Sequence, residues 1–115
     1  MAFLTDESLQ KKYQQSQEIF KALGDKNPAS LSLALLPFEK QERTELTSFL
    51  DLLVEELGRI LHSQMTGGED PGIPGFAPSD YNRARQIILD TADRLRRNAS
   101  ITPALSLMAA KLRSI

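Results

Sequence analysis

The sequence predicts an all-α protein, folded as a compact antiparallel bundle of five helices. Apolar residues recur at spacings of three and four along almost the whole chain, the pattern of amphipathic helices. No window alternates apolar and polar residues, so strands are not expected. With 115 residues, 41% of them hydrophobic, residues 1–115 have the length and composition of a single domain with one core.

The first helix is expected at residues 6–23, and Gly24 is expected to stop it, because glycine enters the left-handed cap conformation freely. Its inward residues would be Leu9, Tyr13, Ile19, Phe20 and Leu23. Asn27-Pro28 reads as a cap and first-turn proline of a second helix at residues 28–36. Pro37 should end or kink that helix, since proline has no amide hydrogen to donate.

A third helix is expected at residues 39–64, where seven apolar residues form one wide stripe suited to a bundle core. They are Leu46, Phe49, Leu50, Leu53, Leu57, Ile60 and Leu61. Residues 66–78 hold four glycines and three prolines, which predicts a flexible loop without regular structure. A loop of this length is either mobile or specifically packed.

A fourth helix is expected at residues 80–97 with Ser79 as its cap, then a break after Asn98, and a fifth helix opened by Thr102-Pro103. The inward residues would be Tyr81, Ala84, Ile88, Ala92 and Leu95 on the fourth helix, and Leu105, Met108, Ala109 and Leu112 on the fifth. The apolar residues Leu52, Leu89, Leu107 and Ala110 fall outside these faces. If they clustered they would mark an interface, and scattered they would be ordinary surface residues.

The charge is unevenly distributed along the chain. Residues 1–78 carry 7 basic and 12 acidic residues, a net −5, whereas residues 79–115 carry 7 basic and 3 acidic residues, a net +4. The basic segment suits nucleic acid or an acidic partner. It equally suits a solvated helix with local ion pairs, because Asp90 and Asp93 each precede an arginine, Arg94 or Arg97, by four residues.

Few residues could carry catalysis, and we expect a protein that is not an enzyme and holds no cofactor or metal. There is no cysteine, which excludes disulfides and thiolate chemistry. The one histidine, His62, leaves open a helical phosphotransfer domain, but a lone histidine cannot build a usual zinc site. Glu55 and Glu56 point about 100° apart on a helix, and Gly67-Gly68 lacks the following Gly-Lys of a phosphate-binding loop.

No apolar run approaches the roughly 20 residues that span a bilayer. The first twelve residues, MAFLTDESLQKK, have neither the basic start nor the apolar stretch of a signal peptide. We therefore expect a cytoplasmic protein that does not contact a membrane.

Three segments in order resemble one family. They are IFKALGDKNPASLSLALLPFEK, ERTELTSFLDLLVEELGRIL and ILDTADRLRRNASITPALSLMAAKL. The chain resembles the C-terminal (collar) domain of bacterial DNA polymerase III clamp-loader subunits, most closely delta-prime: a short helix ending in Gly-Asp before an Ala/Leu-rich helix, a long Leu-rich central helix, and a basic helix running into Asn before a proline-started helix. The similarity covers nearly the whole chain.

The resemblance implies a non-catalytic oligomerisation domain that holds clamp-loader subunits together while the sliding clamp is loaded during DNA replication. The implied partners are the gamma/tau and delta subunits, with DNA contacted only indirectly and no small-molecule substrate. On the outer face of the fourth helix, Arg83, Arg94 and Arg97 would supply polar contacts to a partner. Leu107 and Ala110 of the fifth helix would supply apolar ones. A nucleic-acid-binding bundle and a His62 phosphotransfer domain are the alternatives.

Overall fold

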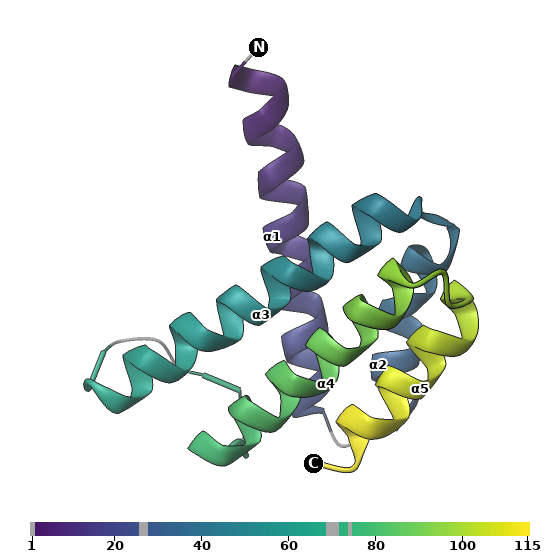
Figure 1. The fold of residues 1–115 in the computed structure, drawn as a ribbon. Helices are drawn as coiled ribbons and strands as arrows, with labels where there is room; N and C mark the ends of the chain where they lie inside the picture. The colour runs from purple at the N-terminus through teal and green to yellow at the C-terminus, as the bar shows by residue number, and fades with distance from the viewer. Residues whose placement is uncertain (1, 26–27, 69–71, 74) are drawn as a thin grey trace.

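The computed structural model describes the backbone of residues 2–25, 28–68, 72–73 and 75–115, with side chains from residue 10 onward except that of Pro28. The side chain of Leu9 and the whole of Asn27 lie outside the described part of the chain, so what the sequence predicts for them stays a prediction. The described chain contains no strand, so the predicted all-α fold is confirmed (Figure 1). Its elements are α1 (Ala2–Gly24), α2 (Pro28–Leu35), the 3-10 helix η1 (Leu36–Lys40), α3 (Arg43–Met65), α4 (Pro78–Arg96) and α5 (Ile101–Arg113).

Helices α3, α4 and α5 run in alternating directions and form the antiparallel part of the bundle (Figure 1). α4 lies between its two neighbours and contacts both. Helix α1 crosses behind α3, and its first turns extend beyond the other helices (Figure 1). Helix α2 contacts α1 and α5, so it closes the back of the bundle. The radius of gyration, 14.0 Å, is close to the value of about 13 Å for a compact domain of this length.

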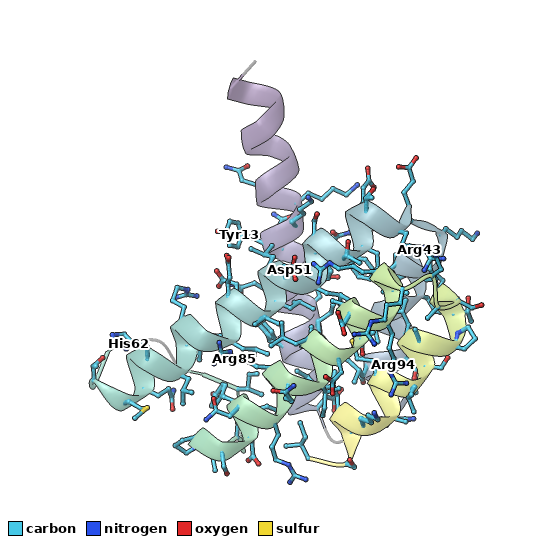
Figure 2. The ribbon with its side chains drawn as sticks, viewed as in Figure 1. Tyr13, Arg43, Asp51, His62, Arg85 and Arg94 are labelled. Atoms are coloured by element: carbon cyan, nitrogen blue, oxygen red, sulfur yellow. The ribbon has the colours of Figure 1, made fainter. Side chains whose placement is uncertain are left out.

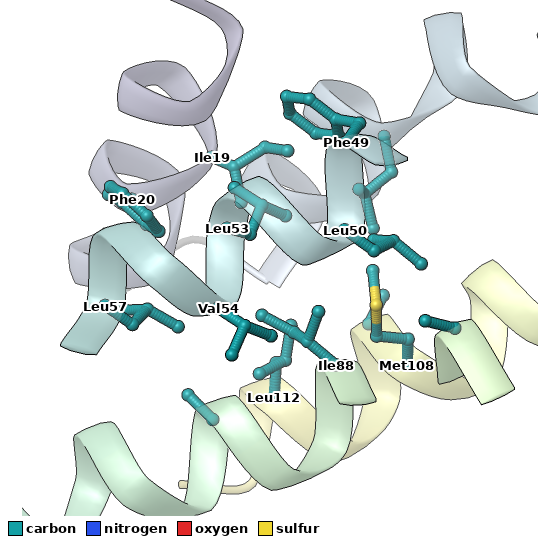
Figure 3. Close-up of a cluster of buried hydrophobic side chains, with 14 of the residues drawn as sticks. Ile19, Phe20, Phe49, Leu50, Leu53, Val54, Leu57, Ile88, Met108 and Leu112 are labelled. Carbon is teal, nitrogen blue, oxygen red and sulfur yellow. The ribbon is translucent and has the colours of Figure 1, made fainter. Parts of the chain in front are cut away.

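The core lies between α3, α4 and α5, with α1 and α2 covering it (Figure 3). Every inward residue predicted on the third, fourth and fifth helices is buried. Leu50, Leu53 and Leu57 of α3 have no solvent exposure at all. Burial of each such side chain contributes on the order of 1.5–3 kcal/mol, so this cluster is the main source of stability. The apolar spacing therefore identified the core of these three helices correctly.

The first helix differs from its prediction at both its start and one inward residue. α1 begins at Ala2, before the predicted residue 6. Ile19 and Phe20 are buried as predicted, but Tyr13 is 39% exposed, so its predicted inward position is wrong. Ser16 is buried instead, and its hydroxyl donates a hydrogen bond of 2.7 Å to the carbonyl of Tyr13. A serine can occupy a core position because its own helix satisfies its hydroxyl group.

The predicted effect of Pro37 is confirmed, because α2 ends at Leu35 and the chain continues as the 3-10 helix η1. Proline lacks the amide hydrogen that a continuing α-helix would need at this point. Phe38 of η1 is buried and stacks on Phe49 of α3, with ring centroids 4.4 Å apart. Because η1 occupies this stretch, the third helix starts at Arg43, and the predicted start at residue 39 is wrong.

Helix α4 begins earlier than predicted, and Ser79 is not its cap. The helix starts with Pro78, preceded by Ala77 in extended conformation. The side chain of Asp80 accepts a hydrogen bond of 2.8 Å from the amide of Ala77. An aspartate in the first turn also suits the positive end of the helix dipole. This capping contact sets where the loop ends and α4 begins.

The predicted break after α4 is present at Asn98, which has a φ of 68°. Asparagine is one of the few non-glycine residues that adopt this left-handed conformation readily. Helix α5 then begins at Ile101 with Ser100 as its cap residue, so the predicted start at Thr102-Pro103 is slightly late. Pro103 lies in the first turn, where its missing amide hydrogen has no partner to lose.

In the loop between α3 and α4, residues 66–77, Ile73 and Phe76 pack against α4. Ile73 is buried, and its amide donates a hydrogen bond of 2.8 Å to the hydroxyl of Tyr81. Phe76 packs edge-on against the same ring, with centroids 5.2 Å apart. Gly72 has a φ of 73°, and a Cβ there would lie 2.7 Å from the Tyr81 hydroxyl, so only glycine fits. These contacts support the packed alternative at Ile73 and Phe76, while flexibility elsewhere in the loop stays a prediction.

Candidate assembly surface

The outer face of the α4–α5 hairpin carries all five side chains that the sequence predicts for partner binding. Arg83 and Arg94 of α4 are exposed, as are Arg97, the cap residue that follows α4, and Leu107 and Ala110 of α5. Figure 2 shows Arg94 on α4 beside α5. The buried residues of both helices point the other way, into the core. None of the five is therefore needed to fill the bundle interior.

One side of α4 faces α3. On that side, Arg96 donates a hydrogen bond of 2.6 Å to Asp51 of α3. The guanidinium of Arg85 lies over Gly58 of α3, where an added Cβ would be 3.5 Å from its Cζ atom. Leu89 follows Arg85 by one helical turn, and it therefore lies on this same side. Leu89 is 40% exposed, and the width of α4 separates it from the exposed residues next to α5.

The other side of α4 faces α5, and two of the predicted arginines lie there. Arg83 and Ile87 of α4 line a cavity together with Lys111 of α5. Arg94 follows Arg83 by eleven residues, which places it about 20° away around the helix axis. Leu107 lies one turn before Lys111 on α5. Because α4 and α5 are antiparallel, going back along α5 from Lys111 to Leu107 moves toward the carboxyl end of α4, where Arg94 lies. Arg83, Arg94 and Leu107 thus border one seam.

The cavity on this seam, which we call the α4–α5 pocket, has a volume of about 310 Å³. Its lining residues are Arg83, Gln86, Ile87, Lys111, Ser114 and Ile115. Two basic side chains, from two different helices, line it together with two partly buried isoleucines. Lys111 and Ser114 were not predicted, because only the pairing of α4 with α5 brings them to Arg83. Gln86 lies one turn from Arg83 on α4 itself, so helical spacing could have found it.

One of the two predicted ion pairs on α4 is formed. Arg97 binds Asp93 at 3.2 Å, with both side chains more than half exposed. The predicted pair between Asp90 and Arg94 is absent from the described ion pairs, and Asp90 instead accepts a 3.3 Å hydrogen bond from Gln86. Exposed pairs contribute roughly 0–1 kcal/mol. Neither pair therefore prevents these arginines from engaging a partner.

The remaining apolar residues predicted to lie off the core do not form one patch. Leu52 is partly buried and packs against the core, and Leu89 lies on the α3 side of α4. Two exposed leucines were not anticipated, Leu33 of α2 at 63% and Leu36 of η1 at 51% exposure. Of the predicted surplus leucines, only Leu107 therefore borders the α4–α5 seam.

Arg43 is the most consequential residue that the sequence did not reveal. It is the first residue of α3, and its Nη1 atom donates a 2.9 Å hydrogen bond to the carbonyl of Leu95. The same atom donates to the carbonyl of Ala99. Leu95 lies in the last turn of α4, where the helix dipole favours a cation, and Ala99 lies in the turn between α4 and α5. Arg43 thereby fixes the turn from which the α4–α5 hairpin projects (Figure 2).

The residues considered for catalysis are dispersed in the described structure. His62 is exposed near the end of α3, well away from the α4–α5 turn (Figure 2). Glu56 binds Arg59 at 2.8 Å, while Glu55 is exposed on a different side of the helix. Among the described residues, no three His, Cys, Asp or Glu side chains are grouped to hold a metal. The His62 phosphotransfer alternative stays an untested prediction.

Comparison of this chain with protein families, with curated proteins and with solved structures finds no match. In the described part of the chain, no helix combines the length and apolar character that crossing a membrane requires.

Proposed function

We propose that this chain is a non-catalytic subunit-assembly domain of a bacterial DNA polymerase III clamp loader, of the delta-prime type. In this role it acts in the cytoplasm, binds the corresponding domains of the gamma/tau and delta subunits, and meets DNA only through the assembly. The specific family rests on the resemblance of the three sequence segments. The general role, binding of protein by protein, rests on the surface of the α4–α5 hairpin.

The observation that carries the proposal is that this hairpin exposes basic and apolar side chains which the bundle does not use. Arg83, Arg94, Leu107 and Ala110 are exposed, although the core between α3, α4 and α5 is complete without them. Protein interfaces are enriched in arginine, whose long apolar stem and planar head contribute both packing and hydrogen bonds. A seam bordered by arginines and a leucine suits such contacts.

The mechanism is the docking of one rigid helical surface on another. Helix α4 is held on one side by the Arg96–Asp51 ion pair and at its carboxyl end by Arg43. Because these contacts orient the hairpin before a partner arrives, little conformational freedom remains to be lost on binding. The net charge of +4 on residues 79–115 favours an acidic surface on the neighbouring subunit.

The test is complex formation with purified collar domains of the gamma/tau and delta subunits, followed by size-exclusion chromatography with light scattering. Leu107→Glu should abolish or strongly weaken the complex, because it places a charge in an apolar contact. Leu33→Glu is the matched control, since Leu33 is exposed on α2, away from the hairpin. Failure of the unmodified chain to bind any of these domains at tens of micromolar would refute the proposal.

A second candidate, nucleic-acid binding, is favoured by one observation. Arg83, Arg94, Arg97 and Lys111 are all exposed on the same hairpin, and they could contact phosphates. This function predicts a duplex mobility shift whose affinity falls steeply with salt, since each phosphate contact releases counterions. Absence of a shift at low salt would remove this candidate.

A further inference from the structure

The solvent-facing side of α4, continued by its cap residue Arg97, carries acids and bases in a fixed order. Asp90, Asp93, Arg94 and Arg97 are all exposed. At about 100° of rotation per residue, the four fall within an arc of about 100°, opposite the buried face of the helix. Along the chain two acids precede two bases, so the same helix running in the opposite direction presents bases where this one presents acids.

Two of these four side chains are available to another molecule. Asp93 and Arg97 are joined at 3.2 Å within the chain. Asp90 and Arg94 have the spacing and order that favour an ion pair within a helix, yet they do not form one. Asp90 accepts a 3.3 Å hydrogen bond from Gln86, and no side chain in the described part of the chain pairs with Arg94.

An antiparallel α4 from a second copy would complement this pair. A two-fold axis level with Ala92, midway between the two residues, places Asp90 of each copy opposite Arg94 of the other, and symmetry forms this contact twice. The two residues lie about 40° apart around the helix, so they share one side of it. In the same alignment Gln86 falls opposite Asn98, and both are neutral. The outer face of α4 is therefore complementary in charge to itself.

The exposed leucine of the hairpin lies close to the same axis. Leu107 is 41% exposed. Helix α4 ends at Arg96 and α5 begins at Ile101, and because the two helices are antiparallel, residues equally far from their turn lie level. Leu107, six residues after Ile101, is thus level with Asp90 and about 3 Å along the helix from Ala92. A two-fold axis there brings the Leu107 side chains of both copies to the same side of the α4 pair.

We propose that the α4–α5 hairpin binds a second copy of this chain, forming a symmetric dimer about an axis beside Ala92 and Leu107. Asp90 of each copy binds Arg94 of the other, and the two Leu107 side chains pack together. The dimer does not depend on the proposed clamp-loader role, but it covers the same hairpin, so self-pairing and binding of another protein compete. One leucine and two exposed ion pairs make a small interface, so the dimer is weak.

The first test is sedimentation equilibrium of the chain alone, from about 20 µM to about 1 mM, the range suited to a small interface. The mean mass should rise from 12.8 kDa towards twice that value. Asp90→Arg and Arg94→Asp should each weaken the dimer at least about tenfold, because like charges then meet at both symmetric contacts. Glu55→Arg, at an exposed position on α3, is the matched control and should change it less than about twofold.

The second test mixes the Asp90→Arg variant with the Arg94→Asp variant. In the mixed dimer the introduced arginine faces the introduced aspartate, and the native Arg94 of one copy faces the native Asp90 of the other. The mixture should therefore dimerise within about threefold of the unmodified chain, although neither variant does so alone. Because both positions are exposed, circular dichroism should show both variants folded.

Three results would each overturn the proposal. The unmodified chain could keep the mass of one chain at the highest concentration. Either single variant could dimerise as tightly as the unmodified chain, or the mixture could dimerise no better than the variants separately. None of these measurements involves the clamp-loader collar domains, so failure of the dimer and failure of the proposed function are distinguishable.

Discussion

Arg43 connects the first turn of α3 to the last turn of α4, and its replacement tests how much this connection stabilises the fold. The informative change is Arg43→Met, which keeps an unbranched apolar stem and removes every donor. Two acceptors would lose a charged donor, the carbonyls of Leu95 and Ala99. The carbonyl of Leu95 keeps a 3.2 Å hydrogen bond from the amide of Asn98, so the loss falls mainly on Ala99.

Hydrogen bonds to charged groups contribute about 1.5–3 kcal/mol each. Because Arg43 is only partly buried and water can reach part of this site, we expect a total loss of about 2–3 kcal/mol in the free energy of unfolding. For 115 residues, the entropy of unfolding is about 0.24 kcal/mol per kelvin. The melting temperature should therefore fall by about 8–12 °C.

The assay is thermal unfolding followed by circular dichroism, with urea unfolding as a second measurement. Arg97→Met is the matched control, because Arg97 makes only an exposed ion pair with Asp93. This control should lose less than about 1 kcal/mol. If Arg43→Met melts within about 2 °C of the control, the carbonyls at the end of α4 are satisfied by water and the reasoning is refuted.

Three further substitutions test the packing, each by urea unfolding. Gly58→Ala should stabilise the protein by about 0.5–1 kcal/mol, because alanine favours a helix more than glycine does. The added Cβ would lie at an ordinary contact distance of 3.5 Å from Arg85, so a loss of stability would contradict this prediction. Tyr81→Phe should cost about 1–3 kcal/mol because the buried amide of Ile73 loses its acceptor, and an unchanged midpoint would show that this amide finds another partner. Leu53→Ala should cost about 2–5 kcal/mol by leaving a cavity in the core, and a loss below about 1 kcal/mol would mean that the core collapses around it.

The candidate surface was predictable in part. Arg83, Arg94 and Leu107 could be assigned to the outside from helical periodicity, since each lies opposite an apolar stripe on its own helix. Their alignment with Lys111 and Ser114 could not be predicted, because it depends on how far α5 slides along α4 when the two pack. Periodicity describes one helix at a time and contains no information about this register.

The errors on α1 and at the start of α3 have a similar origin. Tyr13 has the spacing of a core residue, yet Ser16 is buried instead, because α1 crosses α3 and does not run along it. A crossing helix buries only the short stretch that touches its neighbour. The start of α3 was placed too early because η1 is held by Phe38 stacking on Phe49, a contact between separate elements.

By itself, the sequence determined the all-α class, the five helices and the inward faces of α3, α4 and α5, because apolar spacing, proline and left-handed turn residues act over a few neighbouring positions. The tertiary structure alone decided that Arg43 holds the carboxyl end of α4 and that two bases share the α4–α5 pocket. These contacts join residues 52 positions apart in the first case and depend in the second on the packing of two helices. Local preferences do not specify distances of that kind, since they arise only when the core brings the helices together.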